Sequence, residues 1–257
     1  VNPYNPALLQ HNAAEYMSIQ KDKGKDISEE EAIKAVKNPL AAGALMVRRG
    51  EAEIGVAGNL SSTADVIRAG LRMVGTAAGS KTVSSFFFML KDNNVCMFTD
   101  CAVIPEPTSA QLADIAISTA GVYKRVMGDE ARVALLSFST KGSGKGGTVA
   151  LSQKATEIAK ELAPELAIDG EMQFDAAVSP VVGQLKFPGS KVAGYANTFI
   201  FPCIEAGNIG YKIAQRLGGF EAYGPILQGL NAPINDLSRG CNADEVYKMA
   251  IITAGMA

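Results

Sequence analysis

The sequence is poor in the residues that build the commonest nucleophilic and metal-binding sites. It has a single histidine, His11, so a Ser-His-Asp or Cys-His triad would rest entirely on that side chain. The four cysteines form no CxxC pair, and they stand at Cys96, Cys101, Cys203 and Cys241. We therefore expect neither a catalytic triad nor a zinc site, and we interpret the cysteines as small buried thiols in a reducing cytosol.

Long runs of one charge and long apolar runs are absent as well. The 24 Lys and Arg and 26 Asp and Glu residues give a formal net charge of −2 without a basic cluster, which argues against nucleic acid as the main partner. No apolar run is longer than a strand, so nothing predicts a membrane span. Residues 1–6 lack the basic and apolar regions of a signal peptide, and the missing initial methionine suggests a processed or truncated chain.

The composition does supply a core. Hydrophobic residues make up 47% of the 257 and charged residues 19%, which indicates one large folded domain or two smaller ones. Strand-like and helix-like segments alternate nearly throughout, and this predicts an α/β fold with mostly parallel sheets covered by helices. The expected strands cover 54–57, 82–90, 95–99, 132–138, 166–168, 197–201 and 223–228. The expected helices cover 8–20, 39–49, 63–74, 108–127, 148–162, 175–186, 207–217 and 242–255, with one more opened by a capping box at Ser28.

Four turns combine Ser, Thr, Gly or Asn with a nearby cation, and each follows a strand and stands at or before a helix. The free N–H groups and partial positive charge of a helix N-terminus make such a turn a ready site for an anion. The same residues also cap helices without binding anything, so one turn alone indicates no more than an N-cap. Four together suggest a phosphate or a phosphorylated cofactor. The candidate substrate-binding residues in the first three turns are Ser62, Thr63, Arg68, Ser139, Lys141, Asn208, Tyr211 and Lys212.

The fourth turn lies in residues 224–241, which are too apolar for a loose loop and too rich in Gly, Pro and Asn for a regular element. They predict a short buried strand, a shaped polar turn and then a helix. Ser238 and Arg239 lie in that turn, where a hydroxyl and a guanidinium can converge on an anion. Glu245, six residues after Arg239, has two interpretations. The local sequence favours a capping box with Asn242, and the alternative is a general base beside an anion site.

A glycine pattern in the second turn matches the fingerprint of a dinucleotide-binding fold. Gly142, Gly144 and Gly147 match GxGxxG between a strand and a helix, but they lie in the middle of the chain with a lysine among them. The fingerprint belongs after the first strand of a βαβ unit, so a nicotinamide-dependent dehydrogenase is a minor alternative. A P-loop is excluded because Lys145 is followed by Gly146, where Ser or Thr would be needed.

The first, third and fourth turns, taken together, resemble the phosphate acetyltransferase (phosphotransacetylase) family. The resemblance runs from about residue 8 to the C-terminus, and at GNLSST and RAGLR it is most similar to the ethanolamine-utilisation branch. The segments that carry it are VAGNLSSTADVIRAGL (56–71), TDCAV (99–103), RVALLSFSTKGS (132–143), DGEMQFDAA (169–177), EAGNIGYKIAQRLG (205–218) and GPILQGLNAPINDLSRGC (224–241).

The resemblance implies the reaction acetyl-CoA + phosphate ⇌ acetyl phosphate + CoA, with coenzyme A as a substrate, no permanently bound cofactor and no metal. It implies two α/β domains like those of isocitrate dehydrogenase with the site in the cleft between them. It also implies a homodimer, in the cytoplasm or inside a bacterial microcompartment. The first domain would comprise residues 1–76 and 230–257, without its opening strand-helix units, and the second would comprise residues 77–229.

The family pattern also implies residue roles. Ser238 and Arg239 match the catalytic Ser-Arg pair, and Arg68 matches the arginine of a Ser-Thr-Ala-x-x-x-Arg helix. Glu245 falls where members often carry the carboxylate base, which is Asp in some. These four residues would therefore act on the acyl group, the phosphate and the thiol.

One departure concerns Gln20, which stands where the family usually has the arginine of a Leu-Arg-x-x-Lys-Gly segment. Lys21 or Lys23 would replace it only as a point charge without the guanidinium fork, so we expect weaker binding of phosphate or CoA. The alternatives that remain are a phosphate butyryltransferase and a non-catalytic, regulatory acyl-CoA-binding module. The size of the acyl pocket would distinguish a butyryltransferase from an acetyltransferase. A regulatory module would differ from both enzymes in having no turnover.

Overall fold

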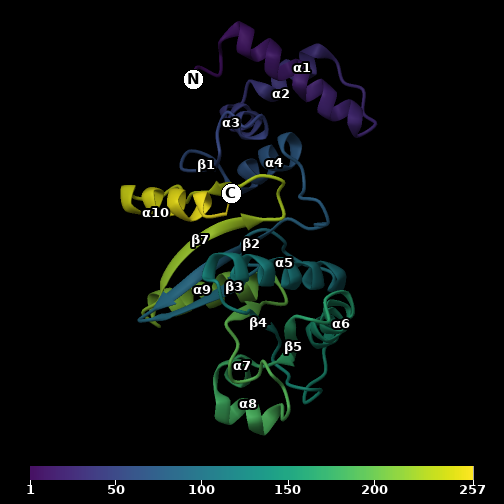
Figure 1. Ribbon diagram of the computed structural model, residues 1–257, viewed down its shortest axis with the longest axis vertical. Coiled ribbons are helices and arrows are strands. Elements are labelled where there is room, and N and C mark those ends of the chain that lie inside the picture. The colour runs from purple at the N-terminus through teal and green to yellow at the C-terminus, as the bar shows by residue number, and fades with distance from the viewer. Residues whose placement is uncertain (257) are drawn as a thin grey trace. The chain divides into compact units, whose positions relative to one another are not determined.

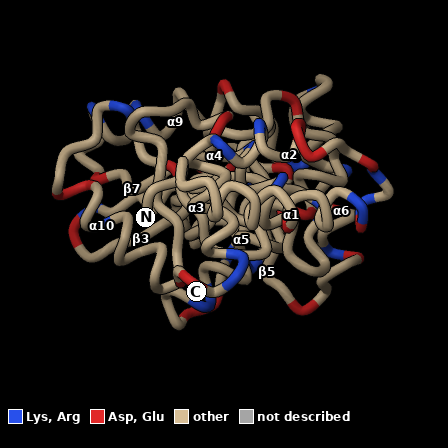
Figure 2. The backbone as a smooth tube through the Cα atoms, turned by 90° about the horizontal axis from the view of Figure 1, so that it is seen from above, with Lys and Arg blue, Asp and Glu red and all other residues tan. Residues whose placement is uncertain are grey.

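The structure is a computed structural model that describes residues 1–256 (Figure 1). The chain divides into two compact units, unit 1 with residues 1–78 and 230–255 and unit 2 with residues 79–229. Basic and acidic residues are interspersed along the backbone, as Figure 2 shows. Within residues 1–256, no helix is both long enough and apolar enough for a membrane crossing.

Unit 1 is organised around a short pair of parallel strands. β1 (Gly55–Ala57) and β8 (Ile234–Asp236) pair from their first residues to their last. The turn predicted over residues 234–236 is wrong, because these residues form β8. The helices of the unit are α1 (Pro6–Asp22), α2 (Glu29–Val36), α3 (Pro39–Arg48), α4 (Thr63–Met73) and α10 (Ala243–Ala254).

Polar caps set where the helices of unit 1 begin. At α2 the Ser28 side chain accepts from the Glu31 N–H, and the Glu31 side chain accepts from the Ser28 N–H. This is the expected capping box, and its two bonds satisfy donors that the first helical turn leaves open. At α3 Asn38 is the cap and Pro39 the first helical residue, as predicted.

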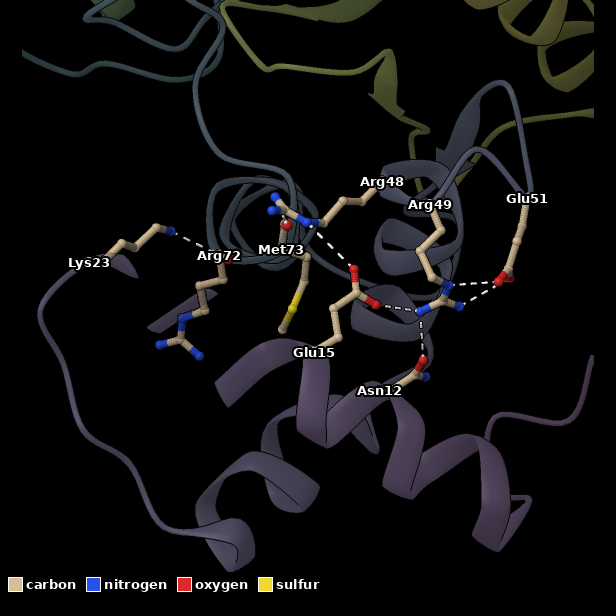
Figure 3. Close-up of polar contacts among 8 residues, drawn as sticks. All are labelled: Asn12, Glu15, Lys23, Arg48, Arg49, Glu51, Arg72 and Met73. Atoms are coloured by element: carbon tan, nitrogen blue, oxygen red, sulfur yellow. Dashed lines mark hydrogen bonds and ion pairs between the residues drawn. The ribbon is translucent and has the colours of Figure 1, made fainter. Parts of the chain in front are cut away.

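A cluster of charged residues joins α1 to α3 and α4, as Figure 3 shows. Glu15 of α1 receives a hydrogen bond of 2.7 Å from Arg49, and it lies 3.5 Å from the guanidinium of Arg48. Arg49 also pairs with Glu51 at 2.7 Å. Arg48 donates to the carbonyl oxygen of Met73, the last residue of α4, at 3.2 Å. A shared, half-buried network of this kind stabilises more than isolated surface pairs do.

Unit 2 is a six-stranded sheet with helices packed on it. The strand order is β5-β4-β6-β3-β2-β7, in which β5, β4, β6 and β3 run parallel and β2 is antiparallel to both β3 and β7. The strands are β2 (Ser84–Lys91), β3 (Asn94–Thr99), β4 (Arg132–Leu136), β5 (Ala167–Met172), β6 (Thr198–Ile200) and β7 (Glu221–Gln228). The helices are α5 (Ser109–Met127), α6 (Gly147–Leu162), α7 (Phe174–Val178), α8 (Pro180–Lys186) and α9 (Ile204–Arg216).

The side chains of β2 divide the core of unit 2 between the two faces of the sheet. Phe87 and Met89 belong to a buried cluster that contains Ala176 of α7 and touches Tyr211 of α9. Neighbouring residues of a strand point to opposite faces, so the buried Phe86 lies on the other face. There α5 contacts β3, β4 and β6 and packs against α6. The predicted α/β fold with mostly parallel sheets is confirmed.

Three expected elements differ most in their bounds. The helix expected over 175–186 is split into α7 and α8, because Ser179 has extended backbone and Pro180 starts the second helix. β5 is longer than expected and ends at Met172. α9 begins at Ile204, three residues before the expected start at 207.

Candidate functional site

The candidate residues fall into one group in each unit. Within unit 1, the pairing of Ala57 with Asp236 ends both strands at the same edge. The turn over 58–62 leaves β1 there, the turn over 237–242 leaves β8 there, and the Leu237 N–H donates to the Ala57 carbonyl at 2.7 Å. Turns after the carboxyl ends of parallel strands are where α/β proteins place their chemistry. The structure thus brings the first and fourth predicted turns together.

The first of these turns ends at the N-terminus of α4. Ser62 caps the helix and donates its hydroxyl to Asp65 at 2.7 Å, and Arg68 pairs with Asp65 at 2.6 Å. The Ser62 bond is the main cause, and the Arg68 charge a further one, of an Asp65 pKa below its ordinary value. The exposed Arg68 uses one guanidinium nitrogen in this pair. Arg68 is the sixth residue of α4, about one and a half turns from the helix N-terminus, where an anion is favoured.

The second turn presents Ser238 and Arg239 to solvent. Both side chains are exposed, and the Ser238 oxygen accepts a hydrogen bond of 3.3 Å from the Gly240 N–H. The Cys241 N–H closes the turn on the Ser238 carbonyl at 3.0 Å. The hydroxyl proton of Ser238 is thus available to a ligand, and the adjacent guanidinium supplies positive charge.

Glu245 occupies the capping box at the start of α10. Its carboxylate accepts from the Asn242 N–H at 3.0 Å, and its own N–H donates to the Asn242 side chain at 2.9 Å. The capping interpretation is therefore confirmed. A role as a base stays a prediction, and the exposure of the carboxylate leaves it accessible to a proton donor.

Asp236 lies at the same edge, at the end of β8, and it is not among the predicted site residues. It is 2% exposed, and its Oδ2 accepts the Thr63 hydroxyl at 2.5 Å. Burial is the main cause of a pKa raised above the ordinary Asp value, which the Thr63 bond, the Leu237 N–H and the charge of Arg239 partly oppose. The available signal was an acidic residue two positions before Ser238, in a segment already predicted to carry part of the site.

In unit 2, the glycine-rich turn after β4 is organised by Glu171 of β5. Glu171 is 2% exposed and accepts from the Ser139 hydroxyl at 2.7 Å and the Gly142 N–H at 2.8 Å. Burial alone would raise the pKa of this carboxyl, but these hydrogen bonds outweigh it and hold the pKa below its ordinary value. Ser139 also accepts from the Gly144 N–H at 2.9 Å, so its fully buried hydroxyl is engaged within the turn. Its role toward a substrate stays a prediction.

Lys141 lies in the same turn and is exposed. Its backbone is left-handed, with φ of 51°, and its ammonium lies 5.0 Å from the centre of the Phe187 ring. A φ in this region is strained for a residue other than glycine, and the bonds to Glu171 hold the turn in it.

The third predicted turn is a helix interior. Because α9 begins at Ile204, residues 205–212 are helical, and the helix start expected at 207 is wrong. The substrate-binding role expected of Asn208, Tyr211 and Lys212 stays a prediction. Asn208 donates to the Cys101 carbonyl at 3.0 Å, and Tyr211 stacks on Phe87 with ring centres 4.0 Å apart. Lys212 is exposed, with its ammonium 5.8 Å from the Tyr211 ring. Of this group, Lys212 is the residue that presents a charge to solvent.

A cavity of about 1120 Å³ opens elsewhere in unit 2. Asn94, Arg132 and Asn197 line it where β3, β4 and β6 begin, together with Phe98, Phe174 and Phe199. These are the amino ends of the parallel strands, and none of the candidate site residues lies in the lining. The cavity is therefore distinct from the unit 2 candidates, which follow the carboxyl ends.

The cysteines are less buried than expected, since Cys101 is buried but Cys96, Cys203 and Cys241 are only partly buried. Burial raises the pKa of Cys96 to about 12 and that of Cys101 well above the ordinary value, so both remain protonated thiols at neutral pH. Within the described residues 1–256, no three His, Cys, Asp or Glu side chains gather in a way that could hold a metal ion.

The chain matches a family model described as "Phosphate acetyl/butaryl transferase" over residues 1–254. It is 51% identical to the phosphate acetyltransferase of Bacillus subtilis, over 93% of this chain and 73% of that one. It is 45% identical to the phosphate acetyltransferase of Thermoanaerobacterium thermosaccharolyticum, over 100% of this chain and 80% of that one.

Solved structures agree with these relatives. A phosphotransacetylase from Streptococcus pyogenes superposes with a TM-score of 0.94 at 45% identity, covering 100% of this chain and 77% of that one. The EutD phosphotransacetylase from Staphylococcus aureus superposes with a TM-score of 0.89 at 43% identity, covering 100% and 78%. A 4-hydroxythreonine-4-phosphate dehydrogenase from Klebsiella pneumoniae, at 10% identity and a TM-score of 0.53, shares the fold alone. The chain therefore belongs to the phosphate acetyltransferase family and is an acyltransferase.

Proposed function

We propose that the chain interconverts acetyl-CoA and phosphate with acetyl phosphate and CoA. The observation that carries the proposal is the shared edge of β1 and β8, from which the Ser238–Arg239 turn and the start of α4 both emerge. Family membership at 45–51% identity supports the same reaction. A hydroxyl donor, two arginines and a carboxylate at one edge suit an acyl transfer between a thiol and a phosphate.

The proposed mechanism is direct attack of the CoA thiolate on acetyl phosphate. The thiol proton passes to the carboxylate of Glu245, directly or through water, because the thiol is mostly protonated at neutral pH. The sulfur forms a bond to the carbonyl carbon, the carbon–oxygen bond to the phosphate breaks, and phosphate leaves with that electron pair. No covalent enzyme intermediate forms.

Other polar residues bind the developing oxyanion and the phosphate groups. Ser238 donates to the oxyanion that develops on the carbonyl oxygen. Arg239 and Arg68 hold the phosphoryl oxygens, for which the planar guanidinium fork is better suited than an ammonium. Among the candidate residues of unit 2, Lys141 and Lys212 are exposed cations, and we assign them to the phosphates of CoA.

Further properties belong to the same proposal. We infer a homodimer in the cytoplasm from the family resemblance. The likeness to a structure named EutD phosphotransacetylase supports the ethanolamine-utilisation branch and, with it, a place inside a microcompartment. A gel-filtration mass and co-sedimentation with shell proteins test these two properties.

The test is thioester formation from acetyl phosphate and CoA, followed by absorbance. We expect Ser238→Ala to lower kcat by about a hundredfold, as loss of one oxyanion donor does. Its matched control is Ser18→Ala on the exposed surface of α1. Arg239→Lys is compared with Arg125→Lys, an exposed arginine of α5. No turnover by the wild-type chain, or equal turnover by Ser238→Ala and its control, would contradict the proposal.

The same assay measures which acyl group the enzyme prefers. Acetyl phosphate and butyryl phosphate are compared by kcat/KM, and we expect acetyl phosphate to be preferred. A preference for butyryl phosphate would identify a phosphate butyryltransferase. CoA binding without turnover would identify a regulatory acyl-CoA-binding module.

A further inference from the structure

Asp236 is a buried carboxylate with too few partners for a residue that serves the fold alone. Its Oδ2 accepts one hydrogen bond, from the Thr63 hydroxyl at 2.5 Å. Its Oδ1 is buried and has no hydrogen-bond partner among residues 1–256. A buried, partly satisfied carboxylate costs stability that an uncharged side chain of the same shape would not. Such a cost is retained where the group has a further role.

The surrounding backbone holds this carboxylate in place. A Cβ on Gly58 would lie 2.1 Å from Asp236 Oδ1 and 2.7 Å from the Leu237 carbonyl oxygen, so only glycine fits there. The preceding residue, Asn235, ties β8 to α10 by donating to Thr253 at 2.8 Å. The carboxyl group therefore has a fixed position relative to the start of α4 and to the turn that carries Ser238.

The bond between Asp236 and Thr63 also fixes the direction of a proton. Thr63 donates its single hydroxyl proton to Asp236 Oδ2, so the Thr63 oxygen carries no second proton to give. The Thr63 oxygen, which is half-buried, then offers only lone pairs to anything that approaches the start of α4. It cannot donate to a phosphoryl oxygen while this bond persists.

We propose that Asp236 is a positioning residue of the acetyl transfer, which fixes the Thr63 oxygen as the acceptor for the S–H group of bound CoA. This inference rests on the proposed function. Fully ionised acetyl phosphate offers acceptors alone, whereas the thiol brings a proton, so of the two reacting groups the thiol suits an oxygen that can only accept. Thr63 orients the sulfur as CoA binds; the S–H group then turns away from Thr63 about the carbon–sulfur bond, and its proton passes to Glu245 as described above.

A double-mutant cycle tests the proposal in the thioester assay. We expect Asp236→Asn and Thr63→Val each to lower kcat by about ten- to a hundredfold, the usual effect of misplacing a reacting atom, with the KM values for acetyl phosphate and CoA changed less than about threefold. The double variant is expected to be no slower than the slower single variant, because both changes remove one coupled pair. Thr63→Ser, which keeps the hydroxyl, is expected to retain kcat within about threefold.

A purely structural role gives a different pattern. Asp236→Asn would then lower the melting temperature and leave kcat per folded molecule unchanged. Asp169→Asn is the control for that pattern, since Asp169 is a buried carboxylate of unit 2 paired with Lys160 at 2.6 Å. An unchanged kcat in Asp236→Asn, additive losses in the double variant, or a Thr63→Ser variant as slow as Thr63→Val would each overturn the inference. An inactive wild-type chain would instead contradict the proposed function, and the two failures are thus distinguishable.

Discussion

Glu245 has one role that the structure shows and one that we propose, and amino-acid replacement separates them. The carboxylate accepts from the Asn242 N–H at 3.0 Å, and the Asn242 side chain accepts from the Glu245 N–H at 2.9 Å. Glutamine can fill the same place in a capping box, because its amide oxygen also accepts a hydrogen bond. It cannot take up a proton at neutral pH. Glu245→Gln therefore keeps the cap and removes the base.

The expected magnitudes follow from these contacts. For Glu245→Gln we expect kcat to fall by about a hundredfold or more, the usual contribution of a general base, with an unchanged melting temperature. Asn242→Ala removes the cap and keeps the carboxylate. It is expected to lower the free energy of unfolding by about 1 kcal/mol, or the melting temperature by about 2–4 °C, while kcat stays within about threefold. Glu245→Ala combines both losses.

Two measurements on the same preparations separate the two roles of Glu245. Initial rates of thioester formation report on the base, and thermal unfolding by circular dichroism reports on the cap. A Glu245→Gln variant with at least half of the wild-type kcat would refute the base, and another proton acceptor would be needed. A Glu245→Ala variant as stable as Glu245→Gln would refute the contribution of the cap to stability. Because each variant is matched by one that loses only the other property, general damage to α10 cannot imitate either result.

Three further changes test other parts of the structure. Gly58→Ala places a Cβ 2.1 Å from Asp236 Oδ1 at a φ of 119°, so we expect urea unfolding to show a loss of about 3 kcal/mol or more. Glu171 has a lowered pKa when folded, so its stabilisation is present above the unfolded pKa of about 4.3 and is lost as pH falls. Glu171→Gln should therefore unfold at a lower urea concentration at pH 7 and lose less stability between pH 7 and pH 3 than the wild type. Arg68→Ala should raise the KM for acetyl phosphate by about tenfold or more, and a KM within twofold of wild type would remove Arg68 from the phosphate site.

The parts of the fold that the sequence predicts well are those in which one local pattern dominates. Capping boxes at Ser28 and Asn242 were correct because their four-residue pattern satisfies backbone donors by itself. The α/β class was correct because long apolar segments alternate with helical ones. β8 was missed because three residues between Pro233 and a polar turn carry no periodicity, and it is a strand only through pairing with β1. The start of α9 was misplaced because Cys203 provides no side-chain cap.

In the candidate site, too, the sequence reveals residues with a local pattern and misses those that depend on tertiary pairing. Ser238 and Arg239 were predicted because their turn is one of four with a similar composition and because the family resemblance assigns them a role, which stays a prediction. Asp236 and Glu171 were not, since an acidic residue in a sequence is expected to be exposed, and only tertiary pairing buries these two.

The two buried carboxylates that the sequence did not reveal differ in how well they are satisfied, and this difference separates their roles. Glu171 receives hydrogen bonds from a hydroxyl and a backbone N–H, its pKa is lowered, and its removal would release the turn that holds Lys141. Asp236 receives one hydrogen bond, from a hydroxyl. Its other oxygen is buried without a hydrogen-bond partner among residues 1–256, and its pKa is raised. A carboxylate that serves as scaffold stabilises the fold in proportion to the donors it collects. By that measure Glu171 supports the fold, whereas Asp236 costs stability beside Ser238 and Arg239, so Asp236→Asn should affect turnover more than folding.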